Sequence, residues 1–169
     1  MKTATRFLLL ALALAAGCAT SYTWKPRVPA ALRTVAVPTF QNESDLMELG
    51  ALSTRQLLRE FQREGTFALA SPDEAALEVQ GVVKSVSMGG VAYSRRQYRS
   101  FTAGLLQVTA LVSVVDKRNG AVLVDNKPYV VETTMASGHD KTTAERDASG
   151  RVADELARRV VDDILNLKW

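Results

Sequence analysis

The spacing of apolar side chains predicts where this chain forms helices and strands. Apolar residues recur every three or four positions through residues 46–64, which predicts a helix that Gly65 ends. Residues 77–88 alternate between apolar and polar types, which predicts a strand with one buried face, broken by a glycine pair at residues 89–90. A second helix is predicted from residue 142 nearly to Trp169, since apolar side chains recur there at every fourth position.

Three further stretches have the composition of β-strands. Residues 33–40 form a predicted first strand with a proline near its end, because proline cannot donate to a β-ladder. Residues 105–116 are apolar on both faces, which predicts a central strand. Residues 117–120 end in Asn-Gly and predict a hairpin turn. Residues 121–135 then return as the partner strand, with an irregularity expected at Pro128.

This order of elements predicts an α+β fold. A strand, a helix, three longer strands and a final helix pack most simply as a two-layer sandwich, with the two helices on one face of the sheet. The sheet is predicted to be mixed or mainly antiparallel and to hold about four strands. Residues 67–70 would also suit a short strand.

The start of the chain follows a different pattern, typical of a secretory signal. Lys2 and Arg6 precede an unbroken apolar run at residues 7–16. That run is too short to span a bilayer as a permanent helix. It ends in Ala-Ala-Gly followed by Cys18, the only cysteine in the chain. This arrangement resembles the bacterial lipoprotein box, in which a lipid is attached to the cysteine and the signal is then removed.

Lipid attachment at Cys18 would divide the chain into three segments. Residues 1–17 are predicted to be the signal peptide, residues 18–31 a lipidated tether with two prolines, and residues 32–169 a single domain. Acyl chains such as palmitate would provide the anchor, since two or more chains hold a protein stably in a membrane. Alanine, not aspartate, follows the cysteine, and by resemblance to lipoproteins of Gram-negative bacteria this favours the outer membrane. The alternative is an ordinary signal peptide with an incidental cysteine.

The charge balance excludes one class of partner. The chain has 21 Lys and Arg residues and 18 Asp and Glu residues, but Lys2 and Arg6 belong to the predicted signal. The mature chain is therefore close to neutral and lacks the basic surplus of nucleic-acid-binding proteins. With Cys18 lipidated, no disulfide can form within the chain.

The chain lacks the groups of residues from which catalytic sites are built. His139 is its only histidine, and no His, Cys or Asp cluster has the spacing of a metal site. His139 and Asp140 could serve as a base and the group that orients it, but adjacent residues rarely form such a pair, and a solvated loop is the alternative. We therefore predict a protein that is not an enzyme and has no cofactor beyond the covalent lipid on Cys18.

One segment has the composition of a binding site. Residues 93–101 contain three arginines and three aromatic side chains. Guanidinium groups bind phosphate oxygens in pairs, and aromatic rings beside them could cover acyl chains or sugar faces. At the outer membrane the abundant phosphorylated ligand is lipopolysaccharide. The alternatives are a solvated hairpin, or arginines that pair with neighbouring acidic residues.

Several motifs together resemble the LptE family of lipopolysaccharide-assembly lipoproteins. The most specific is residues 35–43, Val-Ala-Val-Pro-Thr-Phe-Gln-Asn-Glu, which follows the lipoprotein box. Residues 67–86 and 114–123 are similar to the family's second strand region and central hairpin, and the C-terminal helix completes the likeness. The resemblance covers nearly all of the chain after Cys18. Residues 19–24 lack the Gly-rich start common in the family, which indicates a distant branch.

The resemblance implies a non-enzymatic subunit of the lipopolysaccharide transport machinery. Members of the family plug the LptD β-barrel, support its assembly and bind lipopolysaccharide during delivery to the cell surface. The implied partners are an LptD-like β-barrel, lipopolysaccharide and, through the lipid, the periplasmic side of the outer membrane. Basic residues in loops would meet the ligand or the barrel. The candidates, with one tyrosine among them, are Arg95, Arg96, Tyr98, Arg99, Lys117, Arg118 and Lys127. A free-standing envelope adaptor with no role in lipopolysaccharide transport is the alternative.

Overall fold

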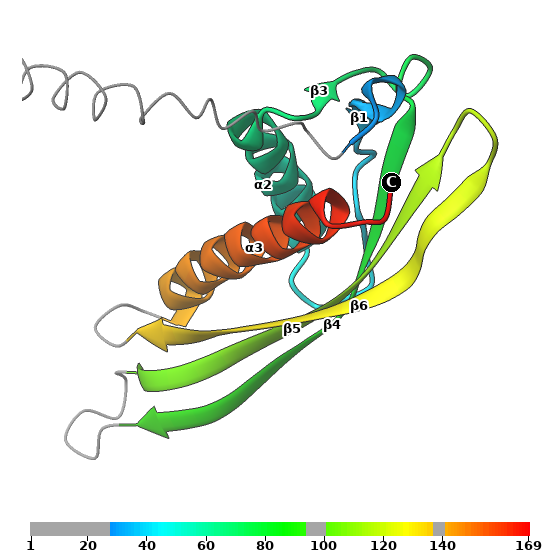
Figure 1. Ribbon diagram of the computed structural model, residues 1–169. Coiled ribbons are helices and arrows are strands. Elements are labelled where there is room, and N and C mark those ends of the chain that lie inside the picture. The colour runs from blue at the N-terminus through cyan, green and yellow to red at the C-terminus, as the bar shows by residue number, and fades with distance from the viewer. Residues whose placement is uncertain (1–27, 94–100, 137–140) are drawn as a thin grey trace, which may run out of the picture.

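The computed structural model describes residues 28–93, 101–136 and 141–169 (Figure 1). Its elements in chain order are the 3-10 turn η2 (Ala30–Leu32), β1 (Thr34–Ala36), β2 (Gln41–Asn42), α2 (Leu49–Glu64), β3 (Ala68–Leu69), β4 (Leu77–Tyr93), β5 (Phe101–Asp116), β6 (Ala121–Ala136) and α3 (Lys141–Leu165). Packing begins at Val28, within the segment predicted to be the tether. Val28 is buried, and its carbonyl accepts a hydrogen bond from Nε of Arg33 at 3.1 Å.

The strands form one mixed sheet in the order β3-β1-β4-β5-β6, with β2 beside β4 off this path. β1, β2 and β3 run parallel to their neighbours, whereas β4, β5 and β6 pair antiparallel. The sheet therefore has six strands, and the prediction of about four was too low. Of the two short strands, β3 lies within residues 67–70, where a short strand was expected, whereas β2 has two residues, too few for an alternating pattern to reveal it.

Both helices lie on one face of the sheet, as Figure 1 shows, and this confirms the predicted two-layer α+β arrangement. α2 packs against α3, and α3 packs against β5 and β6. Every second side chain of the long strands points to the helices, and most of these side chains are buried. The core residues of the three long strands include Leu77, Val79, Val83, Leu106, Val108, Val112, Val114, Val131 and Met135.

The predicted strand at residues 33–40 is shorter in the structure, where β1 covers only Thr34–Ala36, and β2 follows at Gln41–Asn42, beyond the predicted range. β1 ends at Ala36, which pairs with Glu78, and β2 begins at Gln41, which pairs with Val82. From Ala36 to Gln41 the chain advances five residues, whereas β4 advances only four residues, from Glu78 to Val82. One residue between β1 and β2 therefore has no counterpart in β4. Pro38 lies in this interruption, where its missing N–H removes a donor that a continuous ladder would need.

The structure differs from two expectations for the long strands. β4 continues through Gly89 and Gly90 to Tyr93, so the predicted break was wrong; pairing with β5 sustains the strand, with a register shift beside Gly89. In β6, Pro128 pairs regularly with β5, and the irregular residue is Asn126, with φ of 42°. β6 is an edge strand, and a proline whose missing N–H faces the free edge costs no ladder bond.

The helix boundaries follow the prediction at three of the four ends. α2 begins at Leu49 and not at Leu46, because the side-chain amide of Asn42 donates to the carbonyls of Leu46 (2.8 Å) and Met47 (3.2 Å) and holds that turn outside the helix. α2 ends at Gly65, which has φ of 81° and is confirmed as the left-handed cap. α3 begins one residue before the predicted start and ends at Leu165, just after the last residue of its apolar period, Ile164.

Candidate functional site

The motif at residues 35–43 is tied into the core by Phe40. This ring is buried, and its main-chain N–H donates to Oγ1 of Thr54 at 2.9 Å, while the Thr54 hydroxyl donates to the carbonyl of Gly50 at 2.9 Å. A Cβ atom on Gly81 would lie 2.1 Å from the Phe40 ring, and one on Gly50 would lie 2.6 Å from the Phe40 carbonyl oxygen. Phe40 thus joins β4 to α2, and both positions need glycine. The most specific part of the family resemblance is therefore architectural.

The hairpin between β5 and β6 carries two of the predicted ligand residues. Arg118 donates to the buried carboxylate of Asp116 through Nε (3.0 Å), Nη2 (2.6 Å) and its main-chain N–H (3.0 Å). These hydrogen bonds hold the pKa of Asp116 below its usual value. Lys117 forms an ion pair with Glu78 at 3.3 Å and donates to the carbonyl of Pro72. Arg118 therefore holds the turn to the end of β5, and Lys117 fixes it to β4 and to the segment before β4.

Lys127, the third predicted residue in the described part, links β6 to α3. Its Nζ lies 2.7 Å from Oδ2 of Asp163 and 5.5 Å from the centre of the Tyr129 ring. Tyr129 is buried and hydrogen-bonded to Asp163, and burial raises the pKa of its hydroxyl well above the usual value. Lys127 thus has an intramolecular partner, as Lys117 and Arg118 do. Whether any of the three also meets a ligand stays a prediction.

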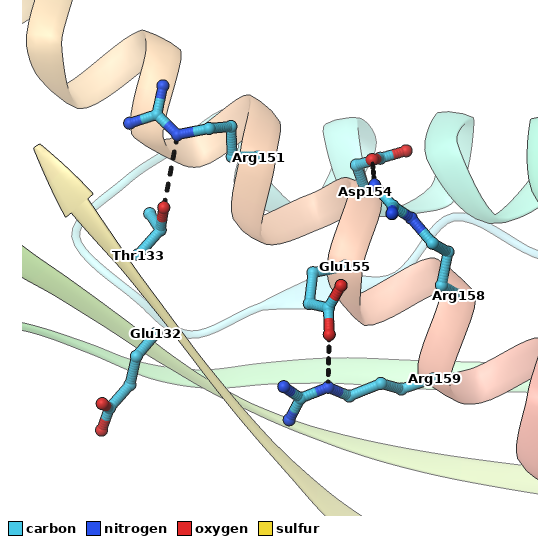
Figure 2. A pocket seen from close by; sticks show the side chains of 7 residues that line it. All are labelled: Glu132, Thr133, Arg151, Asp154, Glu155, Arg158 and Arg159. Atoms are coloured by element: carbon cyan, nitrogen blue, oxygen red, sulfur yellow. Dashed lines mark hydrogen bonds and ion pairs between the residues drawn. The ribbon is translucent and has the colours of Figure 1, made fainter.

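A groove between α3 and the edge of β6 brings three arginines together (Figure 2). The residues that line it are Glu132, Thr133, Arg151, Asp154, Glu155, Arg158 and Arg159. Arg158 pairs with Asp154, and Arg159 with Glu155 at 2.8 Å, each one helical turn apart. The three basic side chains are matched by three acidic ones, so the groove carries no net charge. Exposed ion pairs of this kind contribute little to stability, so a strongly anionic group can compete with the acidic residues for the arginines.

Two of these arginines also cover the open edge of β6. Nη2 of Arg151 donates to the carbonyl of Thr134 at 2.6 Å, and Nη1 of Arg159 donates to the carbonyl of Val130 at 3.0 Å. The two arginines are eight residues apart in the helix, and the two carbonyls that they bind are four residues apart in the strand. Both separations span roughly 12–13 Å, so the spacing of the arginines matches that of the carbonyls. The sequence analysis did not find this contact. The spacing of the two arginines was the available signal, but helical periodicity does not say which strand a polar helix face will meet.

The face of the sheet opposite the helices has no covering layer among the described residues (Figure 1). Where β4, β5 and β6 are in register, its outward positions carry only two charged side chains, Glu78 and Glu132. Its apolar residues are Val82, Leu105, Leu111, Val115, Val122, Pro128 and Val130, here called the outer apolar patch. Val122 is 57% exposed and Val130 is 46% exposed. An exposed apolar surface of this kind indicates an interaction site.

The other predicted site residues lie outside the described residues. They are Cys18, Arg95, Arg96, Tyr98 and Arg99, and the same holds for His139 and Asp140. In the part of the chain that the structure describes, no three His, Cys, Asp or Glu side chains are grouped to hold a metal ion. No helix within residues 28–93, 101–136 and 141–169 is long and apolar enough to cross a membrane.

Comparison with known proteins agrees with the sequence resemblance. Residues 32–164 match the model of the LptE family, described as lipopolysaccharide-assembly. No curated protein is similar enough to be matched by sequence. A hypothetical protein from Chlamydia trachomatis has a similar structure, with a TM-score of 0.54 and 14% identity over 80% of this chain and 96% of that one. A protein from Xanthomonas campestris gives a TM-score of 0.53 and 10% identity over 82% and 88%. These likenesses show a shared fold, and the family model spans most of the chain, so this protein belongs to the LptE family of lipopolysaccharide-assembly proteins.

Proposed function

We propose that this chain is an outer-membrane lipoprotein subunit of the lipopolysaccharide transport machinery. The observation that carries the proposal is the family match over residues 32–164. In this role the lipid on Cys18 holds the domain at the periplasmic side of the outer membrane. The domain plugs an LptD-like β-barrel, supports its assembly and binds lipopolysaccharide on its way to the surface. The role is one of binding and support, without catalysis.

The outer apolar patch supports a close protein partner. A domain enclosed by a barrel packs more of its surface against protein than a free one does, and charged residues are depleted at the centre of protein interfaces. The outward sheet face has this composition, whereas the exposed side of α3 carries ion pairs such as Arg158–Asp154 and Arg159–Glu155. We therefore assign the barrel contact to the sheet face and not to the solvent side of α3.

The basic residues divide into two groups as candidates for the phosphate groups of lipopolysaccharide. Lys117, Arg118 and Lys127 each hold an intramolecular acidic partner, so a ligand would have to compete for them. The cluster at residues 95–99 remains the first candidate, because three arginines and a tyrosine lie close together in the sequence there.

A pull-down of the lipidated chain in mild detergent tests the partner. We expect a large β-barrel to remain bound, and recovery of the native protein as a lone monomer would contradict the proposal. Depletion of the protein tests the role, because a transport subunit is needed for surface lipopolysaccharide. Normal surface lipopolysaccharide after depletion would instead favour a free-standing envelope adaptor.

A further inference from the structure

The two long edges of the sheet differ in how their main-chain groups are covered. The edge of β6 is capped by Arg151 and Arg159 of α3. The edge of β4 is paired with β1 and then with β2, and its last bond is from the N–H of Glu43 to the carbonyl of Val83 at 2.9 Å. Beyond Val83, no described residue pairs with this edge. An uncovered strand edge is a template on which another strand can form.

The pairing register identifies the free main-chain groups of β4. The carbonyl of Val83 points to β2. The main-chain N–H and C=O of Ala110, the residue opposite Val83 on β5, therefore point away from β4. The next β5 residue, Thr109, therefore bonds to β4, and its partner after the bulge is Ser85. By alternation, Val86 and Met88 then direct their N–H and C=O groups to the free edge. A strand added there would find two donors and two acceptors in line.

The side chains beside these groups define what an added strand should look like. On the face towards the helices, Val86 is packed against the core, but Met88 is 37% exposed and would gain an apolar neighbour. On the other face, the hydroxyl of Ser87 donates to Gln107 at 3.2 Å, and Gln107 donates to Glu132, so a polar row ends at the open edge. Residues 85–89 carry no charge. The matching strand is uncharged, apolar on one face and rich in hydroxyl or amide groups on the other.

We propose that the edge of β4 at residues 85–89 binds an extended segment of the barrel partner, which continues the row begun by β1 and β2. About five residues, or roughly 17 Å of strand, fill this stretch. This proposal rests on the proposed function, because the added segment belongs to the barrel partner. A closed barrel has no free strand edge, so the segment comes from a loop or a terminus of the partner and not from the barrel wall.

Hydrogen exchange in the purified complex tests this contact directly. The full lipidated chain is co-expressed with the barrel and purified in mild detergent, and amide exchange is compared with that of the chain alone. We expect the amides of Val86 and Met88 to exchange about tenfold more slowly in the complex, because each gains a main-chain hydrogen bond. The amide of Thr134, on the capped edge of β6, should exchange equally in both samples.

Three variants separate the main-chain contact from other effects. Met88→Pro removes a free N–H but no bond to β5, and it should weaken recovery of the barrel about tenfold. Met88→Val keeps the N–H and shortens the side chain, and Thr134→Pro removes a free N–H from the opposite edge. Both controls should stay within about twofold of the wild type. Urea unfolding of each variant alone shows whether it is folded.

The outcomes distinguish this proposal from the proposed function. If the barrel co-purifies but Val86 and Met88 exchange as in the lone chain, the edge contact is overturned and the function stands. If no barrel co-purifies, the proposed function fails first. Slow exchange of both amides in the lone chain would also overturn the contact. A dependence on protein concentration would then identify a second copy as the occupant, and no dependence would identify another segment of this chain.

Discussion

The helix-facing side of the sheet and its opposite side are made by the same strands but hold different kinds of residue. Towards the helices, Val79, Val108 and Val131 are almost fully buried, and Phe40 fills the space between β4 and α2. Away from the helices, Val130 belongs to the outer apolar patch and is 46% exposed. Because successive strand residues point to opposite faces, neighbouring positions divide between the core and the surface. Stability and partner binding should therefore be separable by substitutions only one or two residues apart.

The largest effect is expected from Phe40→Ala on the covered side. This change empties a fully enclosed site, and we expect a loss of about 3–5 kcal/mol in the free energy of unfolding. Urea unfolding followed by circular dichroism measures it. Val130→Ala, on the uncovered side, is the matched control and should cost about 1 kcal/mol or less. Equal losses from the two variants would show that the two faces do not differ in the way described.

The link between β6 and α3 should give the next largest effect. Asp163→Ala removes the partner of Lys127 and of the buried Tyr129 hydroxyl, and a buried polar group left unpaired costs about 1–3 kcal/mol. The neighbouring exposed residue gives the control, Asp162→Ala, which should change stability by about 0.5 kcal/mol or less. If both variants lose the same amount of stability, Asp163 does not hold the two elements together.

The elements that the sequence predicted are those whose evidence is local. The helices at α2 and α3 follow from an apolar period that each segment carries in itself, and the long strands follow from alternation. The Asn-Gly turn after residue 118 and the cap at Gly65 depend on the conformational range of single residues. Family membership could also be predicted, since several motifs along the chain, of which residues 35–43 are the most specific, together resemble the LptE family.

The features that could not be predicted depend on contacts between distant segments. β2 exists because its two residues meet β4, a strand that lies far along the chain. Arg151 and Arg159 were indistinguishable from other residues on the polar face of a helix, and only the fold places them at the edge of β6. Lys117 and Arg118 were predicted from their charge alone, which does not show that Glu78 and Asp116 lie within reach.

The ion pair between Asp116 and Arg118 should make the stability of the fold depend on pH. Arg118 lowers the pKa of this carboxyl in the folded state, so the ion pair stabilises the fold above the unfolded value of about 3.9 and loses its effect as the pH falls through the lower folded value. Asp116→Asn should cost about 1 kcal/mol at neutral pH. The difference from wild type should shrink below about pH 4. Asp125→Asn, on the same hairpin, is the control, and a difference that grows towards low pH would contradict this assignment.

The smallest effect on stability, but a clear effect on binding, is expected on the uncovered side. The double variant Val122→Thr and Val130→Thr keeps the β-branched shape and adds hydroxyl groups to the outer apolar patch. Both side chains are largely exposed, so the free energy of unfolding should change by about 0.5 kcal/mol or less. Recovery of the proposed barrel partner should fall about five- to tenfold, because the proposed contact would lose buried apolar area. Met47→Thr, at an apolar residue 89% exposed before α2, is the matched control and should leave recovery unchanged. If the double variant recovers as much barrel as the wild type, the sheet face is not part of the interface. The exposed apolar residues of this face would then have no explanation.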